Sequence, residues 1–175
     1  MGMMNRRQLL KIGLVTLPVA YGFGSDSFFL LNPKTDFDVI NAGVGGNNTL
    51  DLLARIDQDC LNHKPKLTIL MVGTNDTNSV KHIPAAQYRT NLNSLVKSIK
   101  SSGSKVLLMS ILPVYESDLL TRHPVSFYEP EGVEESKKQM NKIIEEVAEK
   151  QRVHFLDLGH RFSAIGKIGT DRDSL

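Results

Sequence analysis

Cysteine and tryptophan are nearly absent from this chain, which has one cysteine, Cys60, and no tryptophan in 175 residues. A single cysteine cannot form a disulfide within the chain, so a disulfide-stabilised scaffold is excluded. We expect Cys60 to be buried on the apolar face of a helix. The sequence also has no internal repeat and no low-complexity segment. Its length and its hydrophobic content of 41% predict one globular domain with a full core.

The chain also lacks an excess of either charge, because 21 basic residues face 19 acidic ones and the net charge is +2. This balance gives no electrostatic reason to expect a nucleic-acid partner. An apolar run covers residues 12–20, but Gly13, Thr16 and Pro18 interrupt it. The run is too short to span a membrane, and no cysteine follows it to carry a lipid. We therefore expect no stable membrane anchor.

The amino-terminal region has the composition of a targeting segment. Three basic residues, Arg6, Arg7 and Lys11, precede the apolar run, as in a signal peptide. The order Asn-Arg-Arg-Gln-Leu-Leu-Lys resembles a twin-arginine export signal, and an ordinary secretory signal is the alternative. We expect residues 1–24 to be a signal peptide, cut within residues 20–25. The mature chain would then be periplasmic or extracellular.

The central stretch of the chain is residues 67–78, LTILMVGTNDTN. Its apolar run predicts a strand that is buried on both faces. The residues Gly73-Thr74-Asn75-Asp76 then end the strand, because Gly, Asn and Asp favour turns. Ligands of open parallel sheets bind outside the carboxyl ends of the strands, where the Asn75 amide can donate to a developing oxyanion. The alternative is that Asn75 and Asp76 only shape a turn.

A second candidate loop lies earlier in the chain. Residues 37–41, FDVIN, predict a strand that ends in the glycine-rich loop 42–49, AGVGGNNT. Glycines allow close approach of the backbone to a ligand, and exposed amides bind anions. Asn48 or Thr49 is suited to cap the next helix, whose apolar stripe extends over residues 50–61.

Helices and strands alternate along the rest of the chain. We expect a helix from Pro84 to Gly103, a strand over 105–112, a long connection over 114–130, a helix over 131–150, a strand over 153–158 and a tail, 159–175, without a strong period. This alternation predicts an α/β fold with a parallel sheet covered by helices on both faces. The length of the connection predicts a binding loop or a lid. His123 either lines the pocket there or is an exposed loop residue, and His154 is expected to be structural.

Two loops together resemble one family. Residues 41–49 resemble the second sequence block of the SGNH (GDSL-type) esterases, and residues 73–76 resemble their third block. The resemblance extends over roughly residues 37–169. It implies a flavodoxin-like three-layer α/β/α fold with a parallel sheet. It also implies hydrolysis of esters of small acyl groups, lipids or acetylated sugars through a serine nucleophile, without a metal or organic cofactor.

The resemblance also implies roles for individual residues. Gly46 would supply a backbone amide to an oxyanion hole, and Asn75 would supply its side-chain amide. The nucleophile would be Ser27, because Gly-Ser-Asp-Ser is the nearest match to the Gly-Asp-Ser block of the family and contains one insertion. Asp157-Leu-Gly-His160 matches the letters of the Asp-x-x-His block, although arginine follows it in place of proline. His160 would take the serine proton and Asp157 would orient the imidazole.

Two departures from the family pattern leave a second hypothesis open. Only residues 28–36 separate Ser27 from the next strand, whereas a crossover with its helix needs about ten to twelve residues. The expected domain, residues 25–175, also ends without a final helix, as a truncated chain would. The alternative to an exported esterase is thus an incomplete relative that keeps a ligand-binding pocket without the nucleophile and base. A dinucleotide site at residues 43–46 is a third idea, but the glycine spacing is incomplete.

Overall fold

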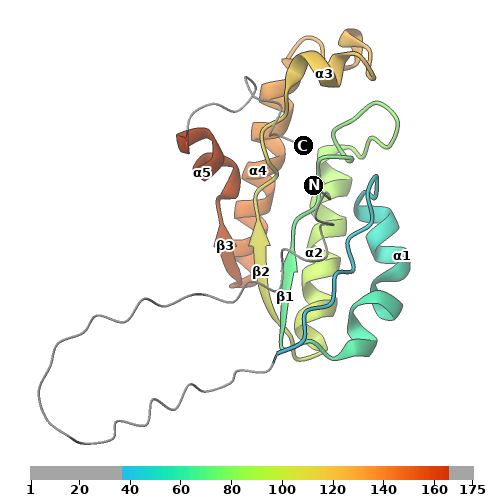
Figure 1. Cartoon of the computed structure of the whole chain (residues 1–175), viewed down its shortest axis with the longest axis vertical. Coiled ribbons are helices and arrows are strands. Elements are labelled where there is room, and N and C mark those ends of the chain that lie inside the picture. The colour runs from blue at the N-terminus through green and yellow to red at the C-terminus, as the bar shows by residue number, and fades with distance from the viewer. Residues whose placement is uncertain (1–36, 166–175) are drawn as a thin grey trace, which may run out of the picture. The chain divides into compact units, whose positions relative to one another are not determined.

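The computed structural model describes residues 37–165. The chain divides into two units, residues 1–39 and residues 40–175, and the fold described here is that of the second unit. Its elements are α1 (Thr49–Asp59), η2 (Leu61–His63), β1 (Leu67–Leu70), α2 (Ala85–Ser101), β2 (Lys105–Met109), α3 (Glu116–Leu120), η3 (Val125–Phe127), α4 (Gly132–Gln151), β3 (His154–Leu156) and α5 (Leu158–Ile165) (Figure 1).

The strands of the described region form one parallel sheet in the order β1-β2-β3. Ile69 of β1 pairs with Leu107 of β2, and Leu107 pairs in turn with His154 of β3. Helix α2 connects β1 to β2 and α4 connects β2 to β3, so each parallel pair has a helical crossover. Both helices pack against β2 and against each other. The predicted α/β architecture with a parallel sheet is therefore confirmed.

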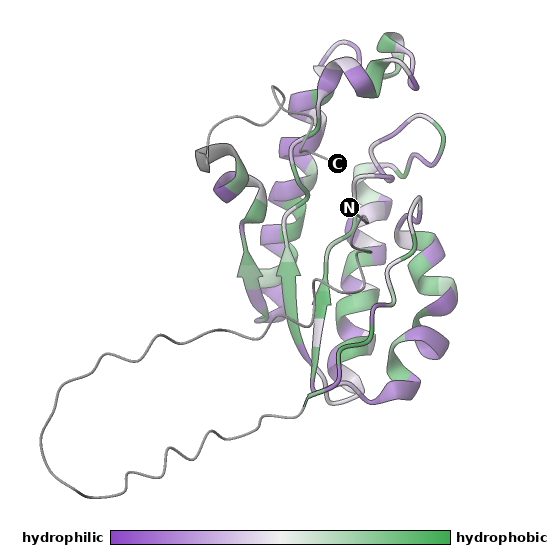
Figure 2. Ribbon diagram, viewed as in Figure 1, coloured by the Kyte–Doolittle hydropathy of each residue, from purple (hydrophilic) through white to green (hydrophobic). Residues whose placement is uncertain are grey.

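The core lies between the sheet and the two helices α2 and α4. Leu108 of β2, Leu92 of α2 and Ile144 of α4 are each 1% exposed. Burial of a side chain of this size contributes about 1.5 to 3 kcal/mol to folding. Figure 2 shows apolar strands beside helices that alternate between apolar and polar residues, as amphipathic helices do.

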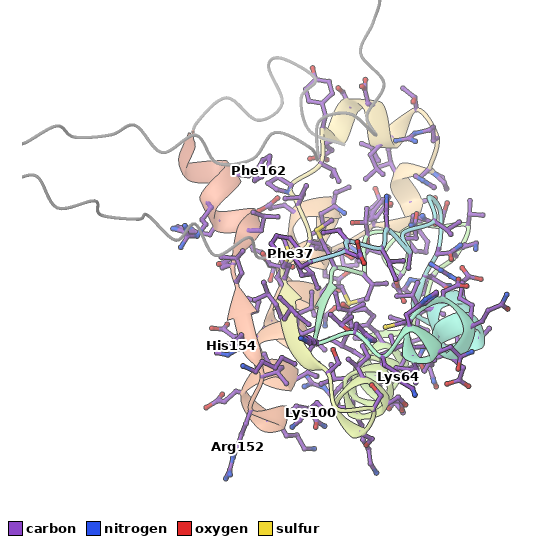
Figure 3. All side chains as sticks on the ribbon, turned by 60° about the horizontal axis from the view of Figure 1, so that its bottom comes forward. Phe37, Lys64, Lys100, Arg152, His154 and Phe162 are labelled. Atoms are coloured by element: carbon purple, nitrogen blue, oxygen red, sulfur yellow. The ribbon has the colours of Figure 1, made fainter. Side chains whose placement is uncertain are left out.

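At the amino-terminal end of the strands, the helices end and the strands begin. Lys64 ends η2 and Arg152 ends α4, both in the left-handed conformation, with φ of 48° and 53°. Figure 3 shows these two residues together with Lys100, which donates to the Gln151 carbonyl, at this amino-terminal edge. The candidate loops lie at the other end of the strands.

Strand β1 is not buried on both faces, contrary to the prediction. Leu67, Ile69 and Met71 are 51%, 60% and 43% exposed, whereas Leu70 and Val72 are each 8% exposed. Side chains alternate between the two faces of a strand. The described helices cover one of these faces at β1 and leave the other open. The apolar sequence of β1 therefore did not mean that both of its faces are buried.

The predicted strand over residues 37–41 is also absent. This segment is irregular, and the chain has no regular element before Thr49 in the described region. A β-rich composition favours an extended backbone, but a strand exists only where a neighbour completes its hydrogen bonds. No described strand pairs with this segment. Cys60, expected to be buried, is only partly buried.

Two further segments are more regular than the sequence pattern indicated. The connection over residues 114–130 contains α3 and η3. The tail, predicted to have no strong period, contains α5. Helix α5 begins where the Asp157 carboxylate accepts a hydrogen bond from the backbone N–H of His160, at 3.0 Å. A cap of this kind stabilises the start of a short helix.

Candidate active site

The two predicted loops meet at the carboxyl end of β1. Asn75 is half-buried in the turn after β1, and its Nδ2 donates to the Asn47 carbonyl at 2.9 Å. Gly46, next to Asn47, has φ +82°, a conformation that favours glycine. Figure 1 shows the loop before α1 and the loop after β1 at the same end of the sheet. Gly46 and Asn75 are therefore brought together as the sequence predicted, although their roles in an oxyanion hole remain a prediction.

Asp76 joins the two loops from inside the protein. It is 0% exposed, and its carboxylate accepts hydrogen bonds from the Thr49 backbone N–H at 3.0 Å and the Thr49 hydroxyl at 2.5 Å. The Asn91 amide of α2 donates to the same hydroxyl at 2.9 Å. Burial raises the pKa of Asp76 above its ordinary value of 3.8, against the opposing effect of the Thr49 hydrogen bonds. Asp76 therefore holds the start of α1 against the end of β1.

The start of α1 is a complete capping box. The Asn48 side chain accepts hydrogen bonds from the Leu50 and Asp51 N–H groups, and the Asp51 carboxylate accepts from the Asn48 N–H at 2.9 Å. Lys81 forms an ion pair with Asp51 at 2.5 Å. The pKa of Asp51 is lowered, first by its hydrogen bond to Lys81. Of the two predicted caps, Asn48 has this role.

Sequence reasoning missed Arg55, which holds the glycine-rich loop. Its Nε donates to Asn47 Oδ1 and its Nη1 donates to the Ala42 carbonyl, each at 2.8 Å. Asp59, one turn later on α1, pairs with the guanidinium at 2.6 Å. The available signal was the Arg-x-x-x-Asp spacing, which places both charges on one helix face. It did not show that the guanidinium reaches a loop eight residues earlier.

The end of β1 is packed closely against α2. Tyr88 is 0% exposed, and its hydroxyl donates to the Val72 carbonyl at 2.8 Å. Burial raises the pKa of Tyr88 above the ordinary range, so this phenol stays protonated. Gly73 has φ +139°, and a Cβ at this position would lie 2.8 Å from the Tyr88 hydroxyl oxygen. The backbone of this turn therefore has no room for a side chain at Gly73 beside Tyr88.

Gly73→Ala is expected to lower the free energy of unfolding by about 2 to 4 kcal/mol, because overpacking and an unfavourable φ act together. Urea unfolding followed by circular dichroism measures this change. Gly45→Ala is the matched control, since a Cβ at Gly45 meets nothing within 4 Å. Equal stability of the two variants would contradict the close packing at Gly73.

The predicted pair Asp157 and His160 lies at the carboxyl end of β3. Asp157 Oδ1 accepts from the Ser110 hydroxyl at 2.8 Å and from the backbone N–H of His160. Ser110 also accepts from the Gly159 N–H at 2.8 Å. These bonds attach the start of α5 to β2, and the His160 side chain is exposed on α5. The catalytic roles of this pair stay a prediction, and Ser27 lies outside the described residues.

The connection after β2 contacts the loop after β1 through two histidines. Ser79 Oγ and His123 Nδ1 are 2.8 Å apart, and His123 is half-buried. The rings of His82 and Phe127 pack edge to face with centroids 5.1 Å apart. The connection therefore packs against the loop that carries Asn75. Its predicted role as a binding loop or a lid stays a prediction.

Residues 37–165 contain neither a metal-binding cluster nor a membrane-spanning helix. No group of three or more His, Cys, Asp and Glu side chains in this part of the chain is arranged to hold a metal ion. No helix in the same residues has the length and apolar character required to cross a membrane.

Comparison with known proteins gives relatives at moderate identity. The chain is 29% identical to "Uncharacterized lipoprotein YqeF" of Bacillus subtilis, over 79% of this chain and 62% of the relative. It is 26% identical to "Acetylxylan esterase" of Geobacillus stearothermophilus, over 77% of this chain and 60% of that protein. The chain thus spans about three fifths of the length of these curated relatives.

A solved structure and a family model also match this chain. The acetyl xylan esterase AlAXEase matches with a TM-score of 0.58 and 23% identity, over 70% of this chain and 59% of that one. At this identity the likeness shows the fold alone, and it supports the predicted three-layer α/β/α arrangement. A model of the GDSL-like lipase/acylhydrolase family matches residues 22–174. Because this match covers most of the chain, the protein belongs to the GDSL-like lipase/acylhydrolase family.

Proposed function

We propose that this chain is an exported serine esterase that cleaves small acyl esters, such as those of acetylated sugars or lipids. The main observation is the contact between Asn75 Nδ2 and the Asn47 carbonyl at 2.9 Å, beside Gly46. It brings a side-chain donor close to the backbone of Gly46 at the end of β1, and two fixed donors near one point are what an oxyanion hole requires. The name of the acetylxylan esterase relative supports the same class of substrate.

The proposed reaction proceeds through an acyl-enzyme. Ser27 Oγ forms a bond to the acyl carbon while His160 takes the hydroxyl proton. The oxyanion accepts hydrogen bonds from the Gly46 N–H and from Asn75, whose amide leaves the Asn47 carbonyl. The ester C–O bond then breaks, and the alcohol leaves with the proton from His160. Asp157 orients the imidazole, and water hydrolyses the acyl-enzyme by the reverse sequence of proton transfers.

The domain arrangement is part of the same proposal. Residues 1–24 would direct export and residues 25–175 would form the catalytic domain. The protein would then act on its substrates in the periplasm or outside the cell. The alternative is that the chain binds its ligand through the same loops without turnover, as a relative without a working nucleophile would.

Labelling of the full chain with a fluorophosphonate, followed by peptide mapping, tests the nucleophile without a known substrate. We expect the label on Ser27 and its loss in Ser27→Ala, while Ser25→Ala, two residues away, keeps it. A label on a different serine would exclude Ser27 as the nucleophile. No label on a folded chain would reject the esterase proposal and support the binding-only alternative.

A further inference from the structure

Lys137 is a buried lysine on the apolar face of α4. It lies on the core-facing side of α4, between the buried residues Val133 and Met140, and only 6% of it is exposed. Buried lysines usually have a charged or strongly polar partner. Within residues 37–165, the partner of Lys137 Nζ is the Thr77 hydroxyl, at 3.5 Å. A buried ammonium with so weak a contact is costly, which indicates a role other than stability.

Thr77 connects this lysine to the turn that carries Asn75. Thr77 is 3% exposed, its hydroxyl donates to the Thr74 carbonyl at 2.8 Å, and its N–H donates to the Gly73 carbonyl at 3.1 Å. These two bonds close the turn on both sides of Asn75. The Asn75 side chain itself donates to the Asn47 carbonyl and accepts from Asn78 Nδ2 at 3.2 Å, so a shift of Thr77 would reach it through the backbone of the turn.

Helix α4 supports the neighbouring strand in the same way. Asn141 lies one turn after Lys137, so both side chains leave the same side of the helix. The Asn141 side chain accepts from the Ile111 N–H at 2.8 Å and donates to the Ile111 carbonyl at 3.3 Å. Helix α4 thus holds the backbone just after β2 through Asn141 and contacts the turn after β1 through Lys137.

We infer that Lys137 is a positioning residue that fixes the direction of the Asn75 amide through Thr77. An ammonium has three donors and no acceptor, so it requires the Thr77 oxygen to accept from it. The Thr77 hydroxyl proton is then directed to the Thr74 carbonyl. A neutral amine is an acceptor, and the Thr77 proton can turn towards it and release Thr74. The consequence for turnover depends on the proposed function, but the positioning itself does not.

The surroundings of Lys137 allow its ammonium to lose a proton at moderate pH. Burial lowers the pKa of Lys137 from 10.5 to about 8, and the Glu134 carboxylate, one turn earlier on α4, opposes the shift. On the turn, the titratable group is Asp76, whose carboxylate is bonded to Thr49. His82 lies on the segment before α2, and His123 lies on the connection after β2. The ammonium therefore predominates at pH 7 and the neutral amine by about pH 9.

NMR of the Asn75 side-chain amide between pH 7 and pH 9.5 tests the positioning directly. The signal is identified by its loss in Asn75→Ala. In the wild type we expect its chemical shift to titrate with a midpoint near pH 8. In Lys137→Met we expect no titration over this range. Lys138→Met, which removes the neighbouring exposed lysine, is expected to titrate like the wild type.

Lys137→Arg provides a second variant if Lys137→Met does not fold, because arginine stays charged over the whole range. We expect its Asn75 signal not to titrate. Persistence of the titration in either variant, or a wild-type signal without a midpoint near pH 8, would overturn the inference. This readout needs no substrate, so it stands if the chain proves not to be an esterase.

If the wild type hydrolyses esters, kcat of Lys137→Met is expected to fall about tenfold at pH 7 with KM unchanged, because a small misplacement of a catalytic donor is costly. We also expect wild-type kcat to fall above pH 8, as the ammonium loses its proton, and we expect no such fall in Lys137→Met. Unchanged kcat would show that the Asn75 amide does not depend on Lys137. Absence of any wild-type turnover would reject the esterase proposal alone.

Discussion

Asn75→Ala is expected to lower kcat for a small acyl ester by about a hundredfold or more, with little change in KM or in the melting temperature. The amide donates to the Asn47 carbonyl in the free protein. In the proposed mechanism, this bond exchanges for one to the oxyanion only in the transition state. Its loss therefore affects turnover more than ground-state binding. Steady-state hydrolysis of p-nitrophenyl acetate measures the change.

The stability of the same variant must be followed, because Asn75 also shapes the turn. Asn78 donates its backbone N–H to the Asn75 carbonyl at 3.2 Å, and this bond survives the substitution. Asn93→Ala is the matched control, since Asn93 is a half-buried amide on α2 that bonds to Gln151. We expect wild-type kcat for Asn93→Ala. A folded Asn75→Ala with wild-type kcat would remove Asn75 from the mechanism.

Asp76→Ala is expected to lower the free energy of unfolding by about 2 to 3 kcal/mol. The substitution leaves the buried N–H of Thr49 without its acceptor and leaves the Thr49 hydroxyl without a carboxylate partner. It also releases the start of α1 from the end of β1, so we expect kcat to fall as Gly46 and Asn75 separate. Urea unfolding and ester hydrolysis measure the two effects.

The effect of Asp76 depends on pH in a defined direction. Its folded-state pKa is raised, so its contribution to stability is complete below the unfolded value near 3.8 and decreases as the pH rises through the folded-state value. The stability advantage of the wild type over Asp76→Ala should thus be larger at pH 4 than at pH 7. Asp57→Ala, which removes an exposed carboxylate of α1, is the control, and it should lower the free energy of unfolding much less than Asp76→Ala does. An equal difference in stability at the two pH values would mean that burial does not raise the pKa of the Asp76 carboxyl.

Much of the fold was predictable because its signals are local. The alternation of elements predicted the parallel sheet, and the Asn48 cap and the apolar stripe of α1 were visible in the sequence. The turn chemistry of Gly73 to Asp76 predicted the turn that follows β1, whereas ligand binding at this turn and at the glycine-rich loop stays a prediction. These features depend on neighbouring residues, so the sequence contains them directly.

The pairing of strands and the coverage of faces were less predictable. Residues 37–41 have a strand composition but no described partner, and β1 has an apolar sequence but one open face. The start of α5 depends on a carboxylate that also binds Ser110 of a distant segment. In each case the outcome depends on groups far away in the chain, which a local pattern does not report.

The sequence by itself determined the fold class, the family resemblance and the two loops that meet near Asn75. Only the tertiary structure decided how those loops are held. It shows Asp76 as a buried link to Thr49, Arg55 as the support of the glycine-rich loop and Lys137 as a buried cation beside Thr77. The physical reason is that burial and hydrogen-bond partners are properties of the packed chain, because residues 13 to 60 positions apart meet only after folding.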